Sequence, residues 1–190
     1  MQHLLPRMGV SMVKITVSGH PGSGTSTLVQ GLCARKGWSS LNGGDIFREE
    51  AQRRGLTLAA FGELCQQELD VDRSLDALLQ ERMVGADATD VVESRLAGWW
   101  AYKLNLPCVR LWLDVSDEER AHRVARREGI TVANALAANQ RRNTVDHDRF
   151  QLLYGLLPHD PEPYTHVLDA TNLNANEILD HVVLLLEALE

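Results

Sequence analysis

The chain has little of what marks a secreted or metal-binding protein. It holds three cysteines, Cys33, Cys65 and Cys108, which lie far apart and match no metal-ligand spacing. Its seven histidines form no H-x-x-x-H pattern or similar ligand set, so zinc is not expected. Cysteines this few and this widely spaced are typical of reduced, mostly buried thiols.

Long apolar runs are also missing. The run 182–186 is far shorter than the roughly 20 residues that cross a bilayer. The first eleven residues have only Leu4 and Leu5 as an apolar core, which argues against a signal peptide. We therefore expect a cytoplasmic protein with no membrane partner, and residues 1–12 as a loose N-terminal tail.

A third absence is an excess of positive charge. Lys and Arg number 19 against 26 Asp and Glu, a formal net charge of -7. This balance argues against the broad basic surface that sequence-independent nucleic-acid binding needs, so no nucleic-acid partner is expected. At 190 residues, 44% of them hydrophobic, the chain suits one compact domain over 13–190. The sequence assigns no oligomeric state.

What the sequence does contain is an alternation of short apolar runs with helical patterns. This alternation predicts a parallel sheet covered by helices on both faces. Two long helical stretches interrupt it: 45–84, broken near Gly55 and Asp70, and 117–154. Such insertions are natural candidates for a substrate clamp and a lid. The expected strands are 13–17, 90–93, 109–114, 165–169 and a short one before Gly44, with helices at about 26–36 and from about 176 onward.

Directly after the first apolar run, residues 19–26 read GHPGSGTS. This is the spacing of a phosphate-binding P-loop, G-x-x-x-x-G-K-[ST], whose backbone N–H groups point at a phosphate beside a helix N-terminus. Ser26 has the position whose hydroxyl binds Mg²⁺. An ordinary glycine-rich turn with a helix cap is the alternative, but strand, loop and helix follow in the order a P-loop requires. The residues expected to bind ATP are Gly19, His20, Pro21, Gly22, Ser23, Gly24, Thr25, Ser26 and Thr27.

The lysine of this motif is absent, because its position holds Thr25. Threonine brings no positive charge to the phosphates, and loss of one charge clamp in phosphoryl transfer costs several powers of ten in rate. The arginine-rich segment 117–154 is the obvious source of a substitute.

Two further segments place an arginine on the acceptor side. Residues 44–48, GDIFR, resemble the G-D-x-x-R element of nucleoside monophosphate kinases. Residues 91–99, VVESRLAGW, put Arg95 just beyond the carboxyl end of a strand, where ligands of open α/β sheets gather. Since a guanidinium can bind phosphate through two parallel hydrogen bonds, we predict that Arg48 and Arg95 hold the acceptor phosphate.

Together these segments resemble the archaeal-type cytidylate kinases. The similarity runs over nearly the whole chain from Val13 and includes 70–73 (DVDR), 93–99 and 127–129 (REG). Threonine is frequent at the lysine position in that family. The resemblance implies the P-loop nucleoside monophosphate kinase fold, with a parallel five-stranded sheet, an acceptor-binding insertion at 45–84 and a lid at 117–154. It also implies ATP- and Mg²⁺-dependent phosphorylation of CMP and dCMP, with acceptor contacts from Asp45, Arg48, Asp72, Arg95 and Asp146.

The lid carries the remaining residues of interest. Residues 142–149, RNTVDHDR, resemble the R-D-x-x-D-x-x-R element of the same family, with Asn143 in place of the first aspartate. The resemblance implies that Arg123, Arg127 and Arg142 contact the transferring phosphoryl group and that Arg149 binds the acceptor or bridges the phosphates. We therefore predict these four arginines as catalytic residues.

Three departures from the family pattern, at Thr25, Ser94 and Asn143, leave two alternatives. One is a nucleotide-binding regulator in which catalysis has weakened. The other is a kinase for a different acceptor, such as AMP, UMP or a small alcohol like shikimate. Retention of the whole arginine set favours an active phosphotransferase, because a binding module has no use for a charge clamp on a transferring group.

Overall fold

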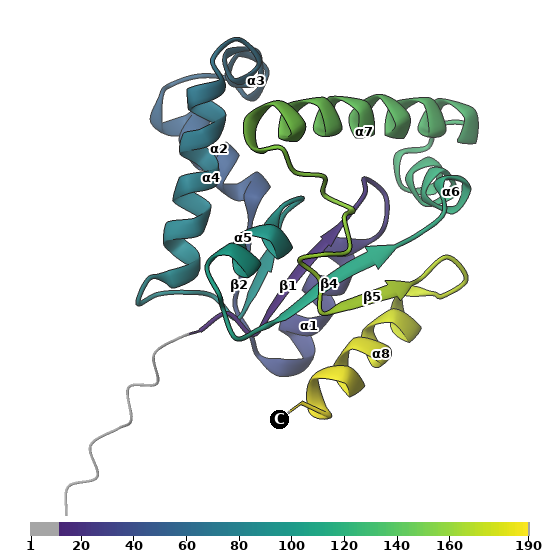
Figure 1. Cartoon of the computed structure of the whole chain (residues 1–190). Helices are drawn as coiled ribbons and strands as arrows, with labels where there is room; N and C mark the ends of the chain where they lie inside the picture. The colour runs from purple at the N-terminus through teal and green to yellow at the C-terminus, as the bar shows by residue number, and fades with distance from the viewer. Residues whose placement is uncertain (1–11, 190) are drawn as a thin grey trace, which may run out of the picture.

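The computed structural model describes residues 12–189. Its centre is a five-stranded parallel sheet with strand order β2-β3-β1-β4-β5, shown in Figure 1. The predicted tail, 1–12, lies outside the described residues apart from its last residue. The predicted parallel sheet is confirmed; its strands are β1 (Ile15–Gly19), β2 (Ser40–Asn42), β3 (Val91–Glu93), β4 (Val109–Asp114) and β5 (His166–Asp169).

The middle strand β1 is buried along its whole length because neighbours flank it on both edges and helices cover both faces. Its Ile15 lies opposite Val91 on one side and Val109 on the other. From β1 the chain passes to β2 and β3 on one side, and then to β4 and β5 on the other. The strand order therefore reverses at β1. A crevice opens at such a reversal, bordered by the carboxyl ends of β1 and its neighbours.

Helices cover both faces of the sheet (Figure 1), and an apolar core fills the space on each face. Helices α1 (Thr25–Lys36) and α8 (Ala175–Glu187) pack on one face and on each other, so closely that a Cβ on Gly31 would lie 2.9 Å from Leu179. On the other face, α4 (Leu69–Val84) and α5 (Ala97–Lys103) contribute Met83 and Trp100 to a second core. Each such buried side chain stabilises the fold by about 1.5–3 kcal/mol.

The segment 45–84 forms three helices, namely α2 (Gly43–Arg53), α3 (Leu58–Gln67) and α4. The predicted break at Gly55 is present, and its left-handed φ of 68° suits glycine. The second break falls at Glu68, two residues before the predicted Asp70. Segment 117–154 forms α6 (Asp117–Glu128) and α7 (Val132–Tyr154), and α7 lies across the top of the molecule in Figure 1.

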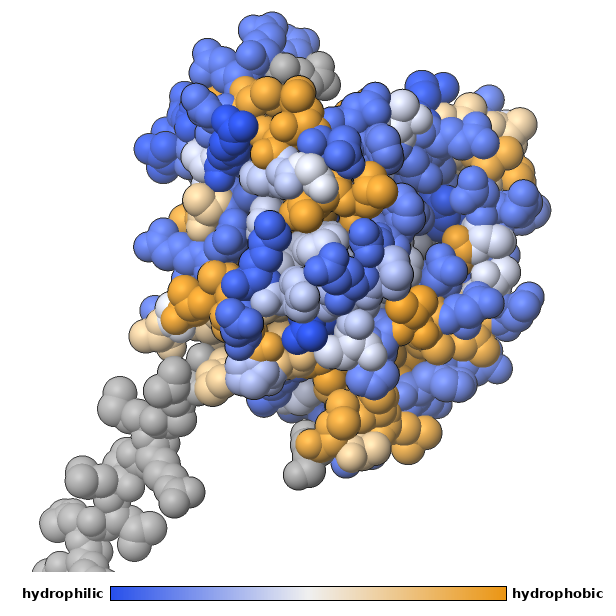
Figure 2. All heavy atoms as spheres, viewed as in Figure 1, coloured by the Kyte–Doolittle hydropathy of each residue, from blue (hydrophilic) through white to orange (hydrophobic). Residues whose placement is uncertain are grey.

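In Figure 2 the visible side is mainly hydrophilic, and its hydrophobic residues lie in separate patches, one of them at the bottom near α8. Among residues 12–189, no helix is both long and apolar enough to cross a membrane.

Candidate active site

A cavity of about 510 Å³ opens at the carboxyl ends of β1 and β3. The loop after β1, the first turn of α2, the inner side of α4 and the arginine-bearing sides of α6 and α7 form its wall. The predicted site residues among its lining are Gly19, His20, Pro21, Gly22, Gly24, Thr25, Ser26, Thr27, Asp72, Arg95, Arg127, Arg142, Asp146 and Arg149. The structure thus brings together residues that lie up to 130 positions apart in the chain.

The loop 19–24 has the backbone of an anion cradle. Gly22 and Gly24 have φ values of 87° and 94°, a left-handed region that residues with a side chain rarely adopt. Gly24 caps α1 without any side-chain hydrogen bond, so the first N–H groups of the helix stay available. Free N–H groups at the positive end of a helix dipole bind phosphate.

Glu93 is a functional residue that the sequence reasoning missed. It ends β3, is 8% exposed, and its carboxylate lies directly beneath the loop. Thr25 Oγ1 and Ser26 Oγ both donate to Oε1 at 2.7 Å, and Asn42 Nδ2 donates to Oε2 at 2.6 Å. The available signal was an acidic residue at the end of a buried strand, two positions before Arg95.

The donor set beside the loop fits a magnesium ion that is shared with phosphates. Mg²⁺ prefers oxygen ligands and is usually held by one or two carboxylates together with substrate phosphates. The Ser26 hydroxyl and the Glu93 carboxylate, 2.7 Å apart, both border the cavity. In the part of the chain that the structure describes, no cluster of three or more His, Cys, Asp or Glu residues forms a complete metal site.

Arg95 connects the phosphate loop to helix α7. Its Nη1 donates to the Gly19 carbonyl oxygen at 2.9 Å, and its Nε donates to Asp146 of α7 at 3.0 Å. Both partners lie on the cavity wall, and the arginine is about three-quarters buried. A guanidinium held in this way presents a positive charge at a fixed position to an anion in the cavity.

Three arginines of α6 and α7 also face the cavity. Arg127 comes from the last turn of α6, while Arg142 and Arg149 lie two turns apart on α7. Desolvation, and after it the neighbouring charge of Arg95, lowers the pKa of Arg142. A concentration of like charges in a concave site attracts a polyanion.

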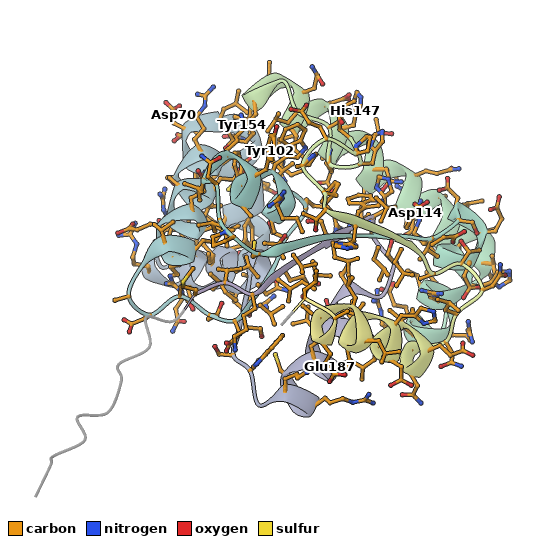
Figure 3. All side chains as sticks on the ribbon, turned by 60° about the horizontal axis from the view of Figure 1, so that its bottom comes forward. Asp70, Tyr102, Asp114, His147, Tyr154 and Glu187 are labelled. Carbon is orange, nitrogen blue, oxygen red and sulfur yellow. The ribbon has the colours of Figure 1, made fainter. Side chains whose placement is uncertain are left out.

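The α4 wall is a mixture of apolar side chains and buried carboxylates. Asp72 is 6% exposed; one of its oxygens lies 3.4 Å from Arg149 Nη1, and the other has no hydrogen-bond partner among the described residues. The Tyr154 hydroxyl donates to Asp76 at 2.7 Å, and Figure 3 shows Tyr154 at the end of α7. Burial raises the pKa of both aspartates. Phe47, Leu75, Leu79 and Phe150 line the cavity beside them.

The loop histidine is electrically neutral near pH 7. Burial, followed by the charge of Arg120, lowers the pKa of His20 to about 4. The imidazole packs edge-on against Trp112, with ring centroids 5.0 Å apart. His20 therefore adds a polar group to the cavity wall without adding a positive charge.

Four predicted site residues do not line the cavity. Asp45 and Arg48 pair with each other on the exposed side of α2, although the Arg48 guanidinium passes over Gly44, which does line it. Ser23 is buried beneath the loop. Arg123 is directed away from the cavity, because the carbonyl oxygens of Ser23, Ala170 and Leu173 accept its hydrogen bonds. The structure thus does not bring Arg123 to the place where a transferring phosphoryl group would lie.

A P-loop at the start of α1, a carboxylate beneath it and arginines from α6 and α7 across the cavity define a P-loop kinase. Solved structures agree on this fold. A shikimate kinase from Acinetobacter baumannii superposes with a TM-score of 0.61 at 14% identity, covering 95% of this chain and 96% of that one. A gluconokinase from Sinorhizobium meliloti gives 0.58 at 19% identity, covering 93% of both chains.

The sequence relatives are more specific. A family model described as an AAA domain matches residues 18–134. A cytidylate kinase from Halobacterium salinarum is 40% identical over 142 residues, covering 75% of this chain and 72% of that protein. One from Pyrococcus furiosus is 38% identical over 157 residues, covering 83% and 79%. The chain belongs to the cytidylate kinase family.

Proposed function

We propose that the protein transfers the γ-phosphoryl group of ATP to the phosphate of CMP or dCMP, giving ADP and CDP or dCDP. The bond between the γ-phosphorus and its bridging oxygen breaks, and a new bond forms to an oxygen of the acceptor phosphate. One observation carries the proposal: a phosphate loop faces, across a single cavity, a wall with a buried carboxylate, one oxygen of which has no hydrogen-bond partner among the described residues. The names of the relatives support the choice of acceptor.

On the donor side, the loop 19–27 binds the triphosphate of ATP through its backbone N–H groups. Mg²⁺ is the proposed cofactor, with Ser26 and Glu93 as its protein ligands; when bound, it neutralises charge on the β- and γ-phosphates. Glu93 also holds the Thr25 and Ser26 hydroxyls in place before any nucleotide arrives.

On the acceptor side, Arg95 and Arg149 bind the phosphate of CMP, and Asp72 lies where the nucleoside would reach α4. A carboxylate accepts hydrogen bonds only, so it suits the exocyclic amino group of cytosine and repels the carbonyl oxygen that uracil has there. Asp146 orients Arg95 and Arg149 through ion pairs at 3.0 and 3.7 Å. We assign Asp45 and Arg48 to the rim of the acceptor site, since they lie over Gly44.

For the transfer itself, Arg127 and Arg142 are the proposed catalytic residues on the lid. Phosphoryl transfer needs positioning and charge neutralisation more than covalent chemistry, and a lid arginine supplies both. Closure of the lid also excludes water, which would otherwise compete with CMP as the nucleophile.

The test is an ADP-release assay with Mg·ATP against CMP, dCMP, UMP and AMP, each alone. We expect strong acceptor-dependent turnover with CMP and dCMP, and at least about 100-fold lower kcat/KM with UMP, the discrimination that an unpaired buried polar group provides. Preference for AMP or UMP would overturn the choice of acceptor. Tight ATP binding without turnover on any acceptor would favour a nucleotide-binding regulator.

A further inference from the structure

The largest fully buried side chain of the described residues is a charged one, Arg120 of α6. It is 1% exposed and pairs with Asp117, which is itself about half exposed. Its Nε donates to the Val115 carbonyl oxygen at 3.1 Å and its Nη1 to the Pro21 carbonyl oxygen at 2.9 Å. A buried guanidinium carries a large desolvation cost, so its place beneath the phosphate loop calls for a functional reason.

The next turn of α6 repeats the contact. Arg123 donates from Nη1 to the Ser23 carbonyl oxygen at 2.8 Å, two residues further along the loop. Glu119 fixes the arginine from below through an ion pair of 2.9 Å. Neither Arg120 nor Arg123 lines the cavity, so both guanidinium groups bind the loop from its outer side.

These two bonds determine where the loop N–H groups point. In a trans peptide the carbonyl of one residue and the N–H of the next point in opposite directions. When the Pro21 and Ser23 carbonyls are directed outward, the Gly22 and Gly24 N–H groups are directed inward. Both glycines line the cavity, and within residues 12–189 neither N–H has a hydrogen-bond partner of its own.

We propose that Arg120 and Arg123 are positioning residues for the triphosphate: they aim the Gly22 and Gly24 N–H groups at it and place two positive charges behind a loop that lacks a lysine. The charges act through the backbone rather than by direct contact. Water and salt screen buried or partly buried charges only weakly, so the two guanidinium groups still attract an anion on the other side of the loop. The influence of Arg120 on the pKa of His20 indicates that its field reaches the cavity side.

The experiment is calorimetric titration with inorganic triphosphate and, separately, with CMP. The variants are Arg120→Met, Arg123→Met and the conservative Arg123→Lys. Arg126→Met is the matched control, because Arg126 lies on the same helix, is 75% exposed and touches no loop residue. The inference rests on the proposed function only in taking a triphosphate as the ligand of the loop.

We expect both Met variants to weaken triphosphate binding by about 10-fold or more, the usual effect of losing one charged hydrogen bond. Their Kd for CMP should stay within about twofold of wild type, which also shows that they fold. Arg123→Lys should recover part of the loss, because it keeps the charge, and Arg126→Met should bind both ligands normally.

The proposal fails if Arg123→Met binds triphosphate as wild type does, or if CMP and triphosphate weaken together in both variants. If Arg120→Met does not fold, as its melting curve would show, Arg123→Met alone decides. A wild-type protein that binds triphosphate but does not phosphorylate CMP would refute the proposed function and leave this inference standing.

Discussion

Replacing Glu93 by glutamine tests how the P-loop is held. The substitution keeps size and shape but removes a charge that accepts three hydrogen bonds. Asn42 Nδ2 can only donate, so the glutamine oxygen must face it and the amide nitrogen must face the Thr25 and Ser26 hydroxyls. All three bonds can form again, but each becomes a bond between neutral groups.

The magnitude follows from that count. A hydrogen bond to a charged group contributes about 1 kcal/mol more than a neutral one, so three bonds that lose their charged acceptor give an upper limit near 3 kcal/mol. Relief of the desolvation cost of a buried carboxylate offsets part of this, which leaves an expected loss of about 1–2 kcal/mol in unfolding free energy. For a domain of this size, that lowers Tm by several degrees.

The assay has two parts, namely thermal unfolding without nucleotide and turnover as a function of Mg²⁺ concentration. We expect Glu93→Gln to melt earlier and to need a much higher Mg²⁺ concentration for half-maximal activity, with kcat/KM reduced about 100-fold or more. Glu49→Gln is the control, because Glu49 pairs with Arg82 on the surface. A variant that melts and responds to Mg²⁺ as wild type does would refute the role given to Glu93.

Three further predictions concern the loop and the acceptor wall. Asp72→Asn should raise KM for CMP about 10-fold with little change in KM for ATP. Its control is Asp70→Asn, which should change neither KM value, because Asp70 is 92% exposed and lies on the outside in Figure 3. If both variants changed KM for CMP equally, Asp72 would be excluded from the acceptor site. Gly22→Ala should reduce ATP affinity and stability by about 1–2 kcal/mol, since its Cβ would lie 3.0 Å from the Arg120 carbonyl oxygen. Gly37→Ala shares the left-handed φ but has open space, so it should lose stability only. For His20, the pKa of about 4 lies below the unfolded value of 6.5, so its stabilising contribution is present above pH 6.5 and declines as pH falls toward 4. His20→Gln should therefore flatten the fall of Tm between pH 6.5 and 4, and an unchanged pH dependence would contradict the low pKa.

The sheet and the phosphate loop were predictable because their signals are local. A buried parallel strand reads as a short, mainly apolar segment, as in 109–114 (VRLWLD), where the prediction matches the strand bounds. The loop after β1 is recognised from its glycine spacing between a strand and a helix, and the left-handed positions at Gly22 and Gly24 favour that residue.

Which arginines of α6 line the cavity and which bind the outer side of the loop was not predictable from the sequence. Spacings of three and four residues put Arg120, Arg123 and Arg127 on one face of α6, but only Arg127 borders the cavity. Which of them turns inward depends on how α6 packs against the loop, which is tertiary information. A signal did exist: Arg120 falls among Ala121, Val124 and Ala125 on the buried stripe of α6.

Arg95 already has two partners, the Gly19 carbonyl and Asp146, before any substrate enters. An acceptor phosphate that binds Arg95 competes with both, so the net gain in affinity is smaller than a free guanidinium would give. The same competition acts on the product, because Asp146 and Gly19 recapture the arginine as CDP leaves. In the proposed function, this exchange favours rapid product release, and it also frees the α7 carboxylate to move when the acceptor arrives. One side chain thereby links occupancy of the acceptor site to the position of the lid.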